Sequence, residues 1–481
     1  MNLAKNLMIQ GTMSGAGKSI LTAGLLRLLK QDGFRVAPFK SQNMALNSYV
    51  TPDGREIGRA QALQALAAGR IVSSDMNPIL LKPTGERSSQ VIVNGLPIGD
   101  MDAKEYFRNK KKYVPDILEA YERLSGDSDI IVIEGAGSPV EINLRTEDIV
   151  NMGLAELVDA NVLLVGNIDP GGVFAQLLGT VNLMPQKERD RVKGLIINKF
   201  RGDVSLLTPG LSMFKEYCDI PFAGVIPYME LDLDEEDSLS DILRERDGFA
   251  YPDKVKIAVI RLPYISNYTD YSIFENLEEA ELIYTQEAKA VADADLVIIP
   301  GTKNTLSDLK WMRERGLDVA VKAAAERNTP VIGICGGFQI LGRSIDDETG
   351  LSLLPADTRF ADEKDLKQVE GVLPGIEGIY APLGGKNFSG YEIHMGRTDA
   401  GEGTSFVITR GSVLGTYIHG FFDSAEIAGE ILRILFERRG IKRDIPAIES
   451  RSTIQDRELD RLAGCLRENL DMDLVYRAIG I

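Results

Sequence analysis

The sequence predicts an α/β protein of two domains, each built on a mostly parallel sheet. Three observations support this prediction. The 481 residues exceed what one ordinary core encloses, short apolar runs alternate with helical patterns, and this alternation is interrupted once before it resumes. The content of 44% hydrophobic and 26% charged residues is typical of globular domains.

The first series of alternating elements occupies residues 1–230. Apolar runs at 5–11 and 34–40 enclose a helical pattern at 19–33, and another helical pattern follows at 55–70. This order is typical of strand–helix–strand units in a parallel sheet. Further buried strands are expected at 128–137, 160–169 and 192–200. Ligands are expected at the carboxyl ends of these strands.

An acidic stretch at 231–253 interrupts this series and is interpreted as a linker or surface helix. A second α/β series occupies 254–440. Its main apolar runs lie at 255–265, 294–304, 329–342 and 412–422. The tail at 441–481 is charged, and the apolar spacing at 459–479 predicts an amphipathic helix that packs back on the body.

The chain is acidic, with 71 acidic and 54 basic residues and a formal net charge of −17. We therefore expect no nucleic-acid partner and no membrane partner. The N-terminus lacks the apolar core of a signal peptide, and no apolar run approaches the roughly 20 residues that span a bilayer. Cys218, Cys335 and Cys465 lie far apart, which disfavours a disulfide or zinc framework and favours a cytoplasmic location.

A Gly-rich loop at 11–19, GTMSGAGKS, follows the first predicted strand and opens the first helix. Backbone N–H groups of such a loop wrap phosphates, while Lys18 neutralises their charge and Ser19 ligates Mg²⁺. The expected nucleotide contacts are Gly11, Thr12, Ser14, Gly15, Gly17, Lys18, Ser19 and Asn198. The loop is one residue longer than the standard motif and resembles that of dethiobiotin-synthetase-like enzymes. A Gly-rich turn without a nucleotide is the alternative.

Two side chains at strand ends are candidates for the same site. Glu134 is expected to hold Mg²⁺ opposite Ser19, with a solvated strand-end glutamate as the alternative. Lys40 closes the second strand and either faces the transferred phosphoryl group or lies on the surface. Asn198 lies where a base-contacting loop commonly follows a strand in such sheets.

The segment GICGG at 333–337 has the form of a nucleophile elbow with cysteine in place of serine. Cys335 is the expected nucleophile, and the N-terminus of the following helix favours its thiolate. The N–H groups of Gly336 and Gly301 are candidates for an oxyanion hole, although a plain turn also explains Gly301. The other two cysteines lack this context and are interpreted as inert thiols.

The sequence contains two histidines, which shortens the search for a base. His419 ends a strand-like run and is the preferred group to deprotonate Cys335. His394 is the alternative.

Taken together, these segments resemble the cobyric acid synthase family, the glutamine-hydrolysing enzymes of the cobalamin pathway. The most specific stretch is 38–95, which includes PFKSQNMALNSYVTPDGREIGRAQALQALAAG. EGAGSPVEINL, PGGVFAQLLGT, GICGGFQILG, GYEIHMGRT and YIHGFF support it. The resemblance implies an N-terminal P-loop domain, dethiobiotin-synthetase-like and ATP-dependent, followed by a class I glutamine amidotransferase domain.

The resemblance also implies a ligase that uses ATP, Mg²⁺ and glutamine. Its implied reaction amidates the b, d, e and g carboxylates of adenosylcobyrinic acid a,c-diamide, with Cys335 as nucleophile and His419 as base. One position departs from the class I pattern, because Phe421 stands where an acid usually follows the histidine. No third member is therefore assigned.

Several residues around 38–95 are candidates to bind the corrinoid polycarboxylate, although each cation is equally explained as a solvated surface charge. They are Lys40, Gln42, Asn43, Arg59, Lys82 and Arg87. Three alternatives stay open from the residues. These are a cobyrinic acid a,c-diamide synthase, an amidotransferase for another carboxylate, and a non-enzymatic ATPase switch of the partitioning type.

Overall fold

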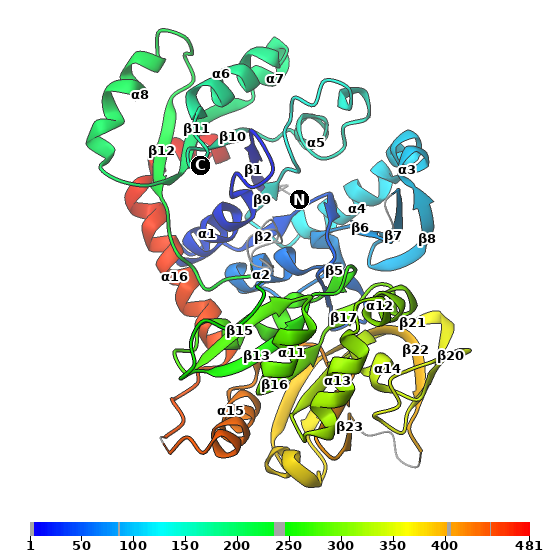
Figure 1. The fold of residues 1–481 in the computed structure, drawn as a ribbon. Coiled ribbons are helices and arrows are strands. Elements are labelled where there is room, and N and C mark those ends of the chain that lie inside the picture. The colour runs from blue at the N-terminus through cyan, green and yellow to red at the C-terminus, as the bar shows by residue number, and fades with distance from the viewer. Residues whose placement is uncertain (1–3, 85–86, 235–245, 402–405, 443) are drawn as a thin grey trace. The chain divides into compact units, whose positions relative to one another are not determined.

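The computed structural model describes residues 4–84, 87–234, 246–401, 406–442 and 444–481 (Figure 1). The chain divides into two compact units, each discontinuous in sequence. Unit 1 comprises Met1–Ala45, Arg55–Ser238 and Gln455–Ile481, and unit 2 comprises Leu46–Gly54 and Leu239–Ile454. Residues 235–245 of the predicted linker lie outside the described residues. Among the described residues, no helix has the length and apolar character that a membrane crossing requires.

Unit 1 is built on a six-stranded parallel sheet in the order β12-β11-β10-β1-β9-β2. The strands are β1 (Lys5–Gly11), β2 (Val36–Phe39), β9 (Ile130–Glu134), β10 (Val162–Asn167), β11 (Val192–Phe200) and β12 (Phe222–Pro227). Their nearly continuous runs of buried Leu, Ile and Val are typical of strands covered on both faces. Because the strands are parallel, the carboxyl ends of β1, β9 and β2 meet at one edge.

Helices and a small sheet complete unit 1. The helices are α1 (Lys18–Gln31), α2 (Arg59–Ala68), α3 (Ala103–Asn109), α4 (Val114–Ser125), α5 (Met152–Leu157), α6 (Val173–Leu183), α7 (Gln186–Arg189), α8 (Thr208–Phe214), α16 (Arg451–Asn469) and α17 (Met472–Ile479). The small sheet has the order β3-β6-β7-β8, formed by β3 (Gln42–Met44), β6 (Ile79–Pro83), β7 (Ser88–Val93) and β8 (Leu96–Asp102). The short strand β5 (Glu56–Gly58) precedes α2.

The C-terminal tail forms two helices rather than the single helix predicted at 459–479. The carboxylate of Asp471 accepts a hydrogen bond from the N–H of Leu474 (3.0 Å). This bond caps the N-terminus of α17, which begins after α16 has ended at Asn469. Leu462 and Leu466 are buried in the same core as α1, and α16 (red) lies beside α1 (blue) in Figure 1. The tail therefore belongs to the core of the N-terminal sheet.

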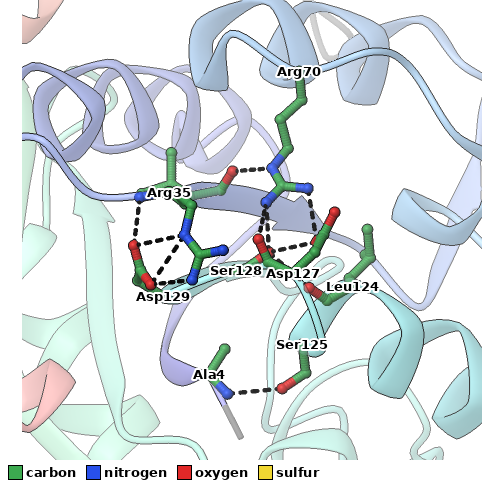
Figure 2. A network of polar contacts seen from close by, with 9 residues as sticks. Ala4, Arg35, Arg70, Leu124, Ser125, Asp127, Ser128 and Asp129 are labelled. Carbon is green, nitrogen blue, oxygen red and sulfur yellow. Dashed lines mark hydrogen bonds and ion pairs between the residues drawn. The ribbon is translucent and has the colours of Figure 1, made fainter.

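A polar network joins the amino ends of β2 and β9 (Figure 2). The guanidinium of Arg70 donates to the carboxylate and carbonyl of Asp127 and to the hydroxyl of Ser128, each at 2.9 Å. Nearby, Arg35 pairs with Asp129. The exposed Arg35 pair contributes little, whereas Arg70 is more buried and has several partners. This network lies at the sheet edge opposite the phosphate loop.

Unit 2 contains a second six-stranded sheet, in the order β15-β13-β16-β18-β24-β23, parallel except for β23. The strands are β13 (Val255–Ile260), β15 (Ala280–Thr285), β16 (Leu296–Ile299), β18 (Val331–Ile334), β23 (Val407–Arg410) and β24 (Val413–Thr416). The helices are α10 (Ser272–Glu275), α11 (Ala288–Asp293), α12 (Thr305–Glu314), α13 (Leu317–Glu326), α14 (Gly336–Leu341) and α15 (Ala425–Arg439). The predicted α/β series at 254–440 thus forms a parallel sheet with helices.

Shorter strands complete unit 2. A four-stranded sheet has the order β20-β19-β21-β22, with β19 (Ser344–Ile345), β20 (Glu348–Thr349), β21 (Asp357–Val372) and β22 (Asn387–Asp399). A two-stranded sheet pairs β14 (Ile265–Ser266) with β17 (Gly301–Thr302). The strand β4 (Ser48–Val50) lies in the segment Leu46–Gly54, which groups with unit 2 although it falls within the range predicted for the N-terminal domain.

Candidate functional site

The phosphate loop connects β1 to α1 at the carboxyl edge of the unit 1 sheet. Gly17 has φ 87°, in the left-handed region that favours glycine, and caps α1. A Cβ at Gly17 would lie 2.3 Å from Nδ2 of Asn198, which donates to the carbonyl of Ala16 (2.9 Å). Asn198 therefore supports the loop from β11. Its predicted contact with the base stays a prediction.

Two loop residues already have partners. The ammonium of Lys18 is buried and donates to the carbonyl of Met13 (3.0 Å), across the loop. The N–H of Thr12 donates to the carbonyl of Val165 (2.9 Å) and so extends the sheet. The predicted phosphate contact of Thr12 therefore cannot come from this N–H while the sheet bond persists.

Glu134 lies at the end of β9 and is 1% exposed. Its carboxylate accepts hydrogen bonds from Ser19 Oγ (2.7 Å), Lys40 Nζ (2.9 Å) and Gln64 Nε2 (2.6 Å). Burial alone would raise the pKa of Glu134, but the charge of Lys40 and these hydrogen bonds hold it below its ordinary value. Ionised Glu134 therefore stands directly beside the phosphate loop.

Ser19 and Glu134 carry oxygens of the kind that bind magnesium, and here they are hydrogen-bonded to each other (2.7 Å). Mg²⁺ is commonly bound by one or two protein oxygens and takes its other ligands from phosphates and water. Among the described residues, no group of three or more His, Cys, Asp or Glu side chains is arranged to hold a metal by itself. A site of this kind would be completed by a bound nucleotide.

Three of the predicted substrate cations have carboxylate partners inside unit 1. Lys40 pairs with Glu134, Lys82 Nζ lies 2.7 Å from Glu56 Oε1, and Arg59 Nε lies 3.1 Å from Asp234 Oδ2. The Lys82 pair is almost fully buried. A substrate carboxylate at these residues would therefore have to share a cation with a carboxylate of the chain.

The predicted amide contacts are also engaged, and one predicted cation is exposed. Gln42 Oε1 accepts from the hydroxyl of Tyr106 (2.7 Å), and Asn43 Nδ2 donates to Gln61 Oε1 (2.9 Å). Arg87 is exposed. Of the six predicted substrate residues, Arg87 is thus the most accessible to a ligand.

Cys335 lies between β18 and α14 and has φ 52°, a strained conformation for a residue with a side chain. This is the geometry of a nucleophile elbow. The turn is closely packed, because a Cβ at Gly336 would lie 2.5 Å from Thr302 Cγ2. A Cβ at Gly301 would lie 3.1 Å from Cε1 of His419. Gly301 therefore lies beside His419, and Gly336 directly follows Cys335.

His419 forms a buried pair with Asp270. Its Nδ1 lies 2.7 Å from Asp270 Oδ2, and Asp270 Oδ1 accepts from the N–H of Gly420 (3.0 Å). Burial alone would lower the pKa of His419, but the charge and hydrogen bond of Asp270, aided by Cys335, raise it from 6.5 to about 10. The arrangement favours an imidazolium next to the cysteine, as general acid chemistry requires.

Sequence reasoning did not find Asp270. It precedes His419 by 149 residues and lies in the 3₁₀ turn Tyr268–Tyr271, where spacing offers no signal. The position two residues after the histidine holds Phe421, which is buried in the core. The carboxylate that class I enzymes take from that position is supplied here from another part of unit 2.

His394, the alternative base, has its ring nitrogens occupied elsewhere. Nδ1 lies 2.8 Å from the carbonyl of Gly396 and Nε2 lies 3.3 Å from Glu392 Oε2. Its ring stacks on Tyr417, with centroids 3.8 Å apart. These contacts favour His419 as the partner of Cys335.

One unit has a cysteine elbow with a His–Asp pair, and the other has a phosphate loop. Together these features define a glutamine amidotransferase that carries a P-loop domain. Comparison with known families agrees. Residues 256–427 match the CobB/CobQ-like glutamine amidotransferase domain, and residues 7–239 match the CobQ/CobB/MinD/ParA nucleotide binding domain.

Curated relatives extend this similarity over the whole chain. A cobyric acid synthase of Ruminiclostridium cellulolyticum is 49% identical, over 99% of this chain and 97% of the relative. Those of Lachnoclostridium phytofermentans and Clostridium acetobutylicum are 48% and 47% identical, over 99% of this chain and 99% of each relative. The chain belongs to the cobyric acid synthase family.

Proposed function

We propose that the chain amidates the b, d, e and g carboxylates of adenosylcobyrinic acid a,c-diamide to give adenosylcobyric acid, using glutamine and ATP with Mg²⁺. The observation that carries this proposal is the similarity to cobyric acid synthases over 99% of the chain. The candidate sites support it, since one chain holds groups for both half-reactions. Location in the cytoplasm stays a prediction from the cysteine pattern.

In the glutaminase half-reaction, the Cys335 thiolate attacks the side-chain amide carbon of glutamine. His419 donates its proton to the leaving nitrogen, so that ammonia departs and a thioester remains. The N–H groups at Gly336 and Gly301 are the proposed donors to the oxyanion. Water, deprotonated by His419, then cleaves the thioester to release glutamate and the thiolate.

In the synthetase half-reaction, a substrate carboxylate oxygen attacks the γ-phosphorus of ATP, releasing ADP and forming an acyl phosphate. Lys18 and Lys40 are the proposed cations that offset negative charge on the transferred phosphoryl group. A Mg²⁺ ion at Ser19 and Glu134 would supply further charge neutralisation. Ammonia then displaces phosphate from the acyl carbon and forms the amide.

The test is to incubate the purified protein with ATP, Mg²⁺, glutamine and the a,c-diamide, and to follow the corrinoid by mass spectrometry. We expect successive intermediates that end at a product with four new amides. Cobyrinic acid that lacks the first two amides should be a poor substrate.

Two results would redirect the proposal. Conversion of cobyrinic acid that stops after two additions would support an a,c-diamide synthase. Absence of any corrinoid conversion, with glutamine hydrolysis intact, would assign the amidation to another carboxylate.

A further inference from the structure

Residues 46–54 group with unit 2, although the chain on either side belongs to unit 1. Val50 is fully buried in a small apolar cluster with Tyr391 and Ile393 of β22. The carbonyl of Val50 accepts a hydrogen bond from Nε2 of Gln368 on β21 (2.7 Å). The segment is thus an integral part of unit 2.

The first contact of this segment is with the turn that carries Asp270. The N–H of Ser48 donates to Asn267 Oδ1 (3.1 Å), and the N–H of Tyr268 donates to Asn47 Oδ1 (3.3 Å). All four residues are buried. Asn267 has φ 52° and precedes the 3₁₀ turn Tyr268–Tyr271, which contains Asp270. The reciprocal bonds therefore hold this turn in place.

The second contact is with a residue that touches His419 directly. The hydroxyl of Tyr391 donates to the carbonyl of Ser48 (2.9 Å). The Tyr391 ring stacks on the imidazole of His419, with centroids 5.4 Å apart and planes inclined by 23°. The backbones of these two residues also exchange hydrogen bonds, at 2.8 and 3.1 Å. The segment thus contacts both groups that hold His419, namely the turn that carries Asp270 and the side chain of Tyr391.

We propose that residues 46–54 are a positioning element of the glutaminase centre, which aligns Asp270 and His419 for reaction with Cys335. The proposal rests on the amidotransferase function proposed above. A hydrogen-bonded catalytic pair works only within a narrow range of geometry, so supports that act on both partners influence the rate. In the chain, the element is flanked by the candidate substrate residues Asn43 and Arg59.

The experiment compares two Tyr-to-Phe variants of the full chain. Tyr391→Phe removes the bond to Ser48 but keeps the ring on His419. Tyr380→Phe is the matched control, because its buried hydroxyl also bonds to backbone carbonyls, those of Ser412 (3.1 Å) and Val331 (3.3 Å). Val331 is the first residue of β18, whereas Cys335 follows the last. Glutamine hydrolysis is measured without corrinoid, together with thermal unfolding.

For Tyr391→Phe we expect kcat for glutamine to fall about fivefold, with little change in KM, because one buried hydrogen bond is lost. The basic limb of its pH profile should move to lower pH, since a less well placed Asp270 supports the imidazolium less. Tyr380→Phe should keep the wild-type rate and profile even if it unfolds at a lower temperature.

A second pair of variants tests the other contact. Asn47→Ala removes the acceptor for Tyr268 and should also lower kcat, whereas Asn47→Asp keeps an acceptor oxygen and should restore most of the rate. If folded Tyr391→Phe and Asn47→Ala both match the wild type in rate and pH profile, the segment only packs on unit 2 and the proposal is wrong. If only the corrinoid assignment fails, the variants should still hydrolyse glutamine more slowly than the wild type. Corrinoid amidation alone would then be absent.

Discussion

At the scale of single residues, the protonation of His419 depends on one carboxylate. Both side chains are buried, so neither exchanges its partner for water. Without Asp270, burial would favour the neutral imidazole, and the leaving amide nitrogen of glutamine would have no proton donor. The 2.7 Å contact with Asp270 is thus the feature on which the chemistry of His419 depends.

Replacing Asp270 by Asn tests this dependence. Asp270→Asn should lower glutamine hydrolysis about 100-fold or more and move its basic limb to lower pH, because the pKa of His419 falls when the negative charge is removed. Since the folded pKa of about 10 exceeds the ordinary 6.5, the pair's contribution to stability is complete below pH 6.5 and is lost as pH rises through about 10. Urea unfolding of the wild type across this range, compared with the variant, measures that loss. An unchanged pH–rate profile would remove Asp270 from this role.

Cys335 offers a second test at this scale. Cys335→Ala should abolish glutamine-dependent synthesis and leave synthesis from high ammonium concentrations largely intact, because only the thiolate forms the thioester. The backbone strain at φ 52° is the same for Ala as for Cys, so the fold should be retained. Corrinoid products from both nitrogen sources are quantified. Loss of both activities in a folded variant would contradict the assignment.

At the scale of elements, the phosphate loop depends on the conformation of the turn that begins α1. Gly15 and Gly17 both have positive φ, 71° and 87°. Their surroundings differ, because a Cβ at Gly15 would contact nothing within 4 Å, whereas one at Gly17 would overlap the amide of Asn198. Substitutions at these two glycines therefore distinguish the effect of backbone strain from that of steric overlap.

Gly17→Ala should therefore weaken nucleotide binding more than Gly15→Ala. Both substitutions incur a left-handed strain of about 1–2 kcal/mol, but only Gly17→Ala also displaces Asn198 from Ala16. Titration calorimetry with ATP and Mg²⁺ compares the two variants with the wild type. Equal affinities of the two variants would indicate that Asn198 does not maintain the shape of the loop.

At the scale of the whole molecule, each unit is assembled from separate parts of the chain. The last 27 residues, Gln455–Ile481, belong to the unit that contains the first residues. Leu462 and Leu466 of α16 fill the space over Gly24 of α1, where a Cβ would lie 2.5 Å from Leu466 Cδ1. The stability of the nucleotide-binding unit therefore depends on the C-terminus.

Leu466→Ala tests this dependence at a residue that is fully buried. The substitution should destabilise unit 1 by about 2–5 kcal/mol through the cavity it leaves. The neighbouring Cys465→Ala is the control, because Cys465 is only partly buried and should have a smaller effect. Urea unfolding followed with and without ATP reports on unit 1. A destabilisation no larger than that of Cys465→Ala would place α16 outside the core.

The sequence by itself determined the features that depend on neighbours along the chain. Strand–helix alternation, the phosphate loop and the cysteine elbow followed from local spacing, because periodicity and turn chemistry act over a few residues. The choice of His419 over His394 rested partly on the family resemblance. The resemblance to cobyric acid synthases likewise came from continuous stretches such as 38–95, and the relatives confirm it.

Only the tertiary structure decided which distant groups meet. It joined Asp270 to His419 across 149 residues and brought Lys40 and Gln64 to Glu134. It also grouped residues 46–54 with unit 2 and the C-terminal helices with unit 1. The physical reason is that these contacts form only when strands pair into sheets and the packed chain buries charged groups, which then need partners. No local pattern encodes which carboxylate or cation the folded chain will place beside another.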